Sequence, residues 1–143
     1  MKNYLVFSMA ALLVGASCNT KQEKAAEGFT GAPGEVKLIT LDPGHFHAAL
    51  VQKVSYPQVS KDVYVYAPTG FDVDEHLKRI QGFNTRAENP TAWNEIVYTG
   101  DDYLDKMLAE KKGNVMIQAG NNGKKTEYIK KTLEAGIKLL SDK

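Results

Sequence analysis

The chain has 143 residues, which is enough for one domain with a modest hydrophobic core. Its apolar content of 43% and charged content of 24% are ordinary for a globular protein. The formal charge is +1 and the basic residues are spread along the chain, so nothing indicates a nucleic-acid partner. The single cysteine, Cys18, excludes an internal disulfide and a metal site made of cysteines.

The first residues are typical of an export signal. A basic start at Lys2 precedes an apolar run from Leu5 to Ser17 that is too short to span a bilayer. The small residues before Cys18 resemble the cleavage site of bacterial lipoproteins, in which the cysteine is lipidated. We therefore predict a signal peptide over residues 1–17 and a lipid-anchored membrane protein of the cell envelope, facing the periplasm or the cell surface. An ordinary cleaved signal with an incidental cysteine is the alternative.

Residues 18–35 are polar and lack apolar periodicity, which predicts a flexible tether. From residue 36 onward, short apolar runs alternate with apolar residues at helical spacing. We expect strands at 36–41, 62–66, 93–98, 115–119 and 137–140. The expected helices have apolar faces made, in chain order, by Phe46, Ala49, Leu50 and Val54; by Val73, Leu77 and Ile80; by Leu104, Met107 and Leu108; and by Ile129 and Leu133. These helices should end at Tyr56-Pro57, Gly82, Gly113 and Gly136.

Five strands that alternate with four helices predict a Rossmann-like α/β fold, with a parallel sheet and helices on both faces. The sequence stops on its last expected strand without a closing helix. We therefore expect residues 36–143 to be an incomplete nucleotide-binding domain whose C-terminal domain is missing, and the natural protein to continue past Lys143.

The turn after the first strand reads Asp-Pro-Gly-His-Phe-His, and α/β proteins bind ligands at this edge of the sheet. Asp42 could orient a histidine or bind a sugar hydroxyl, or it could instead cap the next helix. Gly44 would supply the turn geometry. His45 and His47 could contact a ligand or hold a metal; alternatively, one packs at the helix start and the other is exposed.

Two further turns should lie at the same edge. Thr69 and Gly70 follow the second strand, where a ribose would lie. Asn121 and Asn122 follow the fourth strand and could contact a phosphate or a sugar. A plain turn is the alternative in both places. We expect His76, inside the second helix, to be exposed to solvent.

The tail from Glu134 to Lys143 resembles the N-terminal half of the Gfo/Idh/MocA oxidoreductases. In that family a helix ends in Ala-Gly, a strand follows and a Glu-Lys-Pro motif closes it; here Asp142 and Lys143 would match the Glu-Lys pair. The resemblance implies NAD or NADP as cofactor, hydride transfer on a sugar or polyol, and a catalytic role for Lys143. Because this family binds substrate in its second domain, we expect the present stretch to be inactive alone. The candidate cofactor-binding residues are Asp42, Gly44, His45, His47, Thr69, Asn121 and Asn122.

The chain departs from the family pattern in two places. Asp42, Gly44 and His47 stand where the family usually has three glycines, and the second strand ends without the acid that often holds the ribose. Together with the lipoprotein signal, the turn resembles a lipoprotein oxidoreductase branch of Bacteroidetes-type bacteria. The expected partners are a carbohydrate substrate and the membrane through the lipid, and the sequence allows a homo-oligomer.

Two other functions stay open. A His-x-His after a first strand also resembles amidohydrolases, so His45 and His47 could serve a metal-dependent hydrolase. No third or fourth ligand recurs at a recognisable spacing. The other hypothesis is a non-catalytic envelope lipoprotein that binds carbohydrate.

Overall fold

The computed structural model describes residues 28–120 and 122–142. The predicted signal peptide, Cys18, Asn121 and Lys143 lie outside these residues, as does most of the predicted tether. Within the described part, five parallel strands form one sheet in the order β3-β2-β1-β4-β5. The strands are β1 (Leu38–Leu41), β2 (Asp62–Ala67), β3 (Asn94–Thr99), β4 (Val115–Gln118) and β5 (Lys138–Ser141). The helices are α1 (His47–Leu50), α2 (Phe71–Thr85), α3 (Tyr103–Glu110) and α4 (Lys125–Glu134).

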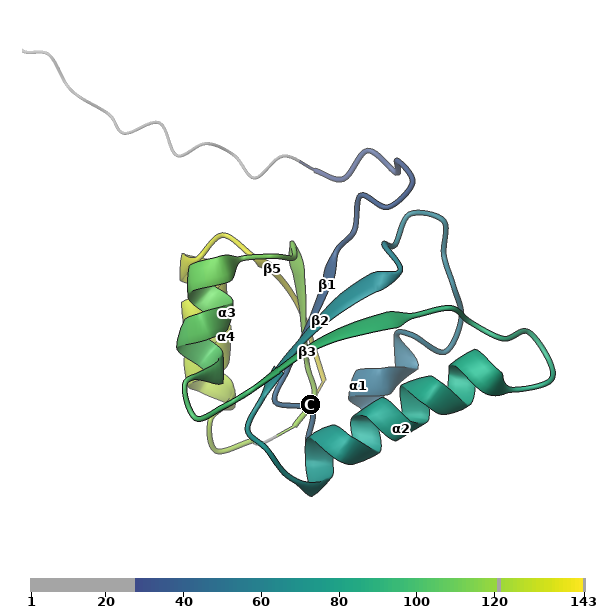
Figure 1. Cartoon of the computed structure of the whole chain (residues 1–143). Helices are drawn as coiled ribbons and strands as arrows, with labels where there is room; N and C mark the ends of the chain where they lie inside the picture. The colour runs from purple at the N-terminus through teal and green to yellow at the C-terminus, as the bar shows by residue number, and fades with distance from the viewer. Residues whose placement is uncertain (1–27, 121, 143) are drawn as a thin grey trace, which may run out of the picture.

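The helices lie on both faces of the sheet. Helices α1 and α2 cover one face, and α3 and α4 cover the other (Figure 1). The chain moves outward from β1 to β3 and then returns to place β4 against the other side of β1. The predicted Rossmann-like α/β fold is confirmed. The strand order reverses between β1 and β4, which is the point where such sheets form a ligand crevice.

The core occupies both faces of the sheet. All four residues of β1 are buried, which explains why three of them are large apolar residues instead of alternating with exposed polar ones. Alternate residues of β1 serve the two faces: Ile39 and Leu41 pack with Tyr128 beneath α3 and α4, and Leu38 packs with Ile80 beneath α2. No helix in the described residues is long and apolar enough to cross a membrane.

Helix α1 is much shorter than predicted, and its buried residues are Ala48 and Ala49. Trp93 Nε1 donates to Gln52 O at 2.6 Å, and this carbonyl would accept the Tyr56 amide in a longer helix. Arg86 Nη2 donates to Lys53 O at 2.7 Å, a carbonyl that would have no helical partner because residue 57 is proline. The expected apolar face was largely wrong. Its exposed members are Phe46, Leu50 and Val54.

Two other helix predictions were also wrong in detail. Helix α2 continues through Gly82 to Thr85, and the Gly82 carbonyl accepts the closing hydrogen bond from the Arg86 amide. Helix α4 buries Tyr128 and Thr132, while Leu133 is exposed. The predicted apolar face was wrong because α4 turns Tyr128 toward the sheet. The hydroxyl of Tyr128 can be buried there because it donates a hydrogen bond to the buried Asp42 carboxylate.

Candidate functional site

The turn after β1 packs tightly against the end of β4. Asp42 adopts φ 45°, and its carbonyl accepts the Gly44 amide at 2.9 Å. The His45 amide donates to Ala119 O at 3.1 Å. A Cβ atom on Gly120 would lie 2.1 Å from Asp42 O and 2.7 Å from Gly44 N, so only glycine fits there. The turn is therefore fixed by contacts within the protein.

The Asp42 carboxylate points into the protein and is part of a hydrogen-bonded chain. Its Oδ2 accepts the Tyr128 hydroxyl at 2.6 Å, Tyr128 is hydrogen-bonded to Tyr103, and Lys124 Nζ donates to the Tyr103 hydroxyl at 3.1 Å. Burial raises the pKa of Tyr128 above its usual range. The N-cap of α1 is Phe46, with no side-chain cap, so the interpretation of Asp42 as a helix cap was wrong.

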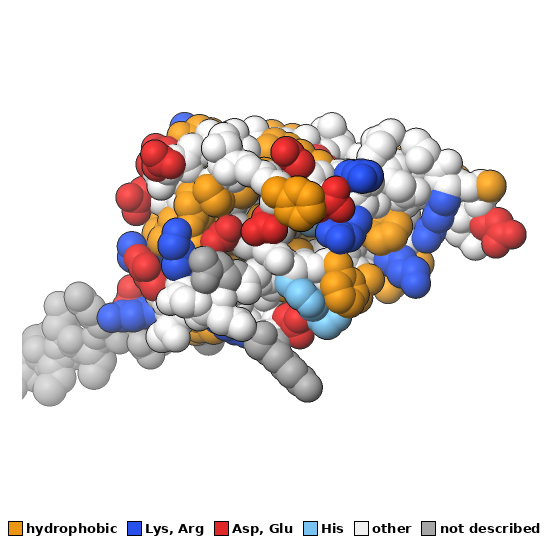
Figure 2. All heavy atoms as spheres, turned by 90° about the horizontal axis from the view of Figure 1, so that it is seen from below, with side chains coloured by type: hydrophobic (Ala, Val, Ile, Leu, Met, Phe, Trp, Pro, Cys, Tyr) orange, Lys and Arg blue, Asp and Glu red, His pale blue; other side chains and the backbone are white. Residues whose placement is uncertain are grey.

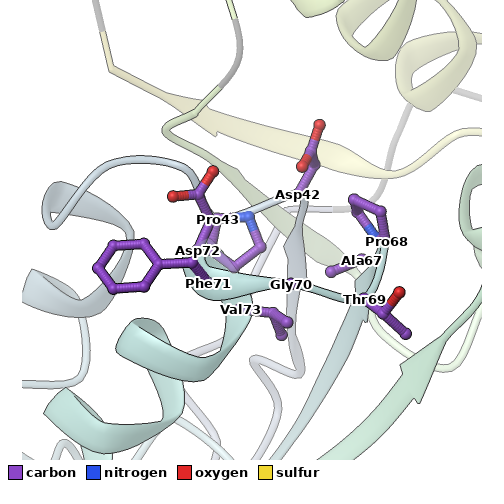
Figure 3. Close-up of a pocket in the computed structure, with 9 residues that line it drawn as sticks. All are labelled: Asp42, Pro43, Ala67, Pro68, Thr69, Gly70, Phe71, Asp72 and Val73. Carbon is purple, nitrogen blue, oxygen red and sulfur yellow. The ribbon is translucent and has the colours of Figure 1, made fainter.

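One crevice opens beside this turn at the carboxyl ends of β1 and β2, and we call it the β1–β2 crevice (Figure 3). Its volume is about 270 Å³, and it is lined by Asp42, Pro43 and residues 67–73. Thr69 lies in it, at the place predicted for a ribose contact. Asp72, the second residue of α2, also lines it and supplies an acid that the end of β2 lacks.

A second crevice opens on the other side of the turn, and we call it the β1–β4 crevice. Its volume is about 340 Å³, and its lining is Gly44, His45, His47, Gly120, Asn122 and Asp142. Seen from the carboxyl edge of the sheet, histidine side chains are open to solvent beside acidic and hydrophobic side chains (Figure 2).

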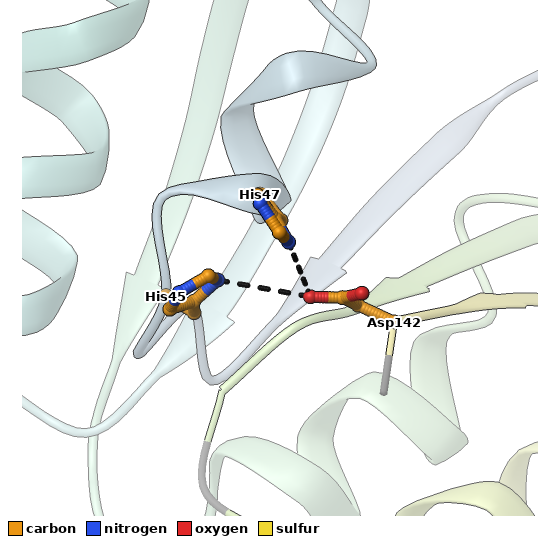
Figure 4. A group of neighbouring side chains, drawn as sticks. All are labelled: His45, His47 and Asp142. Carbon is orange, nitrogen blue, oxygen red and sulfur yellow. Dashed lines mark hydrogen bonds and ion pairs between the residues drawn. The ribbon is translucent and has the colours of Figure 1, made fainter.

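The two histidines of this crevice meet a carboxylate from the far end of the chain (Figure 4). His47 Nδ1 is hydrogen-bonded to Asp142 Oδ2 at 2.5 Å, and His45 Nδ1 lies 3.7 Å from the same oxygen. The two imidazole rings are 4.3 Å apart and meet edge to face. The side chains of His45, His47 and Asp142 are 47%, 39% and 31% exposed, so an ion or small molecule can reach them.

The structure therefore divides the predicted residues between two crevices. Gly44, His45, His47 and Asn122 are brought together in the β1–β4 crevice, whereas Thr69 lies in the other.

His76 belongs to neither crevice, and the prediction that it is exposed was wrong. It is 2% exposed, no described residue hydrogen-bonds its ring nitrogens, and burial lowers its pKa to about 4. Its spacing from Val73 and Ile80 places all three on the inward face of α2, a signal that the sequence contained.

Two acids of the site were not predicted from the sequence. Asp72 has the position of a first-turn residue that suits the helix dipole, but the first turn after a strand also lies at the ligand edge. The sequence resemblance used Asp142 only as the counterpart of a motif glutamate, but Asp142 also directly follows β5 at the same edge as His45 and His47. Both could have been found by asking which polar side chains follow each strand of a parallel sheet.

Fold and crevices together define a Rossmann-like α/β domain with its ligand edge at the carboxyl ends of the strands. No protein-family model and no curated protein sequence matches the chain. The chain is similar to the crystal structure of a "putative oxidoreductase" from Parabacteroides merdae ATCC 43184, with 97% sequence identity and a TM-score of 0.81. The match covers 82% of this chain and 27% of that one, so the chain spans about a quarter of the length of the protein it matches.

Proposed function

We propose that this chain is the nucleotide-binding part of an NAD- or NADP-dependent oxidoreductase that acts on a sugar or polyol. The observation that carries the proposal is the β1–β2 crevice, where Asp72 and Thr69 line the position in which Rossmann-like folds hold a ribose. The identity of 97% with part of the Parabacteroides merdae protein supports the oxidoreductase class. The resemblance to the Gfo/Idh/MocA family supports a sugar or polyol as the substrate.

The residues fit a nucleotide at its ribose end but not in a standard pyrophosphate grip. That grip needs amides that point at the ligand from a glycine-rich turn. Here Pro43 has no N–H, and the amides of Gly44 and His45 donate to Asp42 and Ala119. We expect the pyrophosphate to lie farther along the edge, toward Asn122; the contact predicted for Asn121 lies outside the described residues.

The remaining predictions belong to the same proposal. The reactive end of the cofactor would lie over the β1–β4 crevice, near His45 and His47, with Lys143 as the catalytic residue. Cys18 would carry the lipid that anchors the protein in the cell envelope. Lys143→Ala in an enzyme that also contains the substrate domain should remove most turnover, measured as nicotinamide absorbance with a panel of sugars and polyols.

Nucleotide binding tests the proposal directly on the full chain. NADH and NADPH are titrated by their fluorescence into wild type, Asp72→Asn and Asp74→Asn. Both acids lie in the first turn of α2, but only Asp72 lines the crevice, so Asp74→Asn is the matched control. Loss of a charged acceptor for the ribose hydroxyls should weaken NADH binding about tenfold or more in Asp72→Asn and leave Asp74→Asn unchanged.

Two results would contradict the proposal. One is that neither nucleotide binds wild type at millimolar concentration. The other is that both variants bind as tightly as wild type, because the crevice would then play no part in binding.

A further inference from the structure

We propose that His45, His47 and Asp142 bind one divalent transition-metal ion in the β1–β4 crevice. Each residue offers one ligand atom, and all three atoms lie within 4.8 Å of one another. Among the described residues, no other group of three or more histidine, cysteine, aspartate or glutamate side chains comes together in this way. The proposal does not depend on nucleotide binding.

The ligands come from two distant parts of the chain, the turn after β1 and the end of β5, yet their backbones are fixed. The His45 amide is bonded to Ala119 O at 3.1 Å, and His47 begins α1. The Asp142 amide donates to Gln118 O at 3.0 Å, which extends the pairing of β5 with β4. Binding a metal would therefore require side-chain rotation and no rearrangement of the sheet.

The distances suit an ion after small rotations. A zinc ion binds imidazole nitrogen and carboxylate oxygen at about 2.0–2.2 Å, which separates the ligand atoms of a tetrahedral site by about 3.3 Å. The His45 to Asp142 separation of 3.7 Å is already close to that value, and the contact of 2.5 Å from His47 to Asp142 would lengthen as the ion enters. The hydrogen bond between His47 and Asp142 is then the metal-free arrangement of the same ligands.

The ligand set and the cavity define the class of ion. Two imidazoles and one carboxylate suit zinc, iron, cobalt or manganese, and three protein ligands leave coordination positions open. The ligands are partly exposed toward a crevice of about 340 Å³, which has room for water or an oxygen-bearing ligand on the ion. Such a site is of the open type that binds a small molecule through the metal.

Cobalt(II) titration of the metal-stripped full chain, without nucleotide, tests the proposal. All proteins carry Cys18→Ser, so that no thiol binds cobalt. We expect one ion per chain, a visible cobalt absorption band and a rise in the unfolding temperature. His45→Ala, His47→Ala and Asp142→Asn should each weaken binding about tenfold or more, because each removes one of three ligands. Asp72→Asn, at the other crevice, is the control and should bind as the parent does.

Circular dichroism checks that each variant is folded before titration, and Asp142→Asn keeps the shape of the side chain if an alanine variant fails to fold. Absence of binding to the parent at millimolar cobalt would overturn the proposal. Binding that the three variants leave unchanged would also overturn it. The cobalt titration depends on His45, His47 and Asp142, whereas the nucleotide titration depends on Asp72. Failure of the metal site can therefore be distinguished from failure of the proposed cofactor site.

Discussion

The two crevices beside the first turn differ in chemistry although they share a wall. The β1–β2 crevice presents the Thr69 hydroxyl and the Asp72 carboxylate, which suit the hydroxyls of a ribose. The β1–β4 crevice presents two histidines and Asp142, which suit an ion or a reacting group. In a standard dinucleotide fold, the glycine-rich turn between these regions binds the pyrophosphate.

Here the turn separates the crevices instead. Its Gly44 and His45 amides are bonded within the protein, Gly120 is pressed against it, and Asp42 is held by Tyr128. The site is thus divided into two halves, each with its own polar residues. Displacing the shared wall should disturb both halves, whereas changes within one crevice should leave the other intact.

Gly120→Ala should have the largest effect because it displaces the wall of both crevices. The new Cβ would meet backbone atoms of Asp42 and Gly44, which cannot move as a flexible side chain can. We expect a loss of about 3 kcal/mol in the free energy of unfolding, measured in urea. Gly82→Ala is the control, because open space surrounds Gly82 in α2 and the change should stabilise by about 0.5–1 kcal/mol. Equal stability of Gly120→Ala and wild type would contradict the close packing.

Acid should destabilise the α2 side of the molecule through His76. Its pKa is about 4 in the folded protein and 6.5 in the unfolded chain, so the unfolded chain binds more protons between these values. The buried neutral imidazole contributes its full share to the free energy of unfolding above pH 6.5. This contribution is lost as the pH falls toward 4. The full loss corresponds to about 3 kcal/mol, so His76→Leu should gain that much relative to wild type across this window.

Glu95→Gln provides a control of opposite sign. Burial raises the pKa of Glu95 to about 7, although its hydrogen bond from Gln52 acts against that rise. Wild type therefore loses stability from this group as the pH rises from 4.5 to 7, and Glu95→Gln should not. Urea unfolding of the three proteins from pH 4 to 8 measures both effects, and parallel profiles for wild type and His76→Leu would contradict the first.

Tyr128→Phe should lower the free energy of unfolding less than Gly120→Ala does, although it also loosens the turn after β1. The change removes the hydroxyl that donates to the buried Asp42 carboxylate, which should cost about 2 kcal/mol in urea unfolding. Tyr98→Phe removes a similar bond, to Asp102, at an exposed position and should cost about 0.5 kcal/mol or less. Equal losses in the two variants would show that the buried hydrogen bond from Tyr128 to Asp42 stabilises the protein no more than the exposed bond from Tyr98 to Asp102.

Much of the fold could be predicted from the sequence because local patterns and the tertiary structure agree. Buried strands such as β1 and β2 appear as apolar runs, and the alternation of strands with helices dictates a parallel sheet. The length of α1 could not be predicted, because it depends on the side chain of Trp93, which comes from a distant segment and binds the Gln52 carbonyl.

Part of the candidate site could be predicted because the sequence shows where the first strand ends. His45 and His47 follow the first strand, and the carboxyl ends of parallel strands form the ligand edge of such a sheet. Their meeting with Asp142 depends on the sheet order, which puts β4 beside β1 and β5 beside β4. The spacing of these residues along the chain does not reveal the order of the strands in the sheet.

Titration with adenosine separates the two halves of the site, because adenosine carries the ribose but neither the pyrophosphate nor the nicotinamide. We expect Asp72→Asn to bind adenosine about tenfold more weakly than wild type, and His47→Ala to bind it as wild type does. Equal binding by wild type and Asp72→Asn, or a loss in His47→Ala as large as that in Asp72→Asn, would contradict the division of the site into two halves.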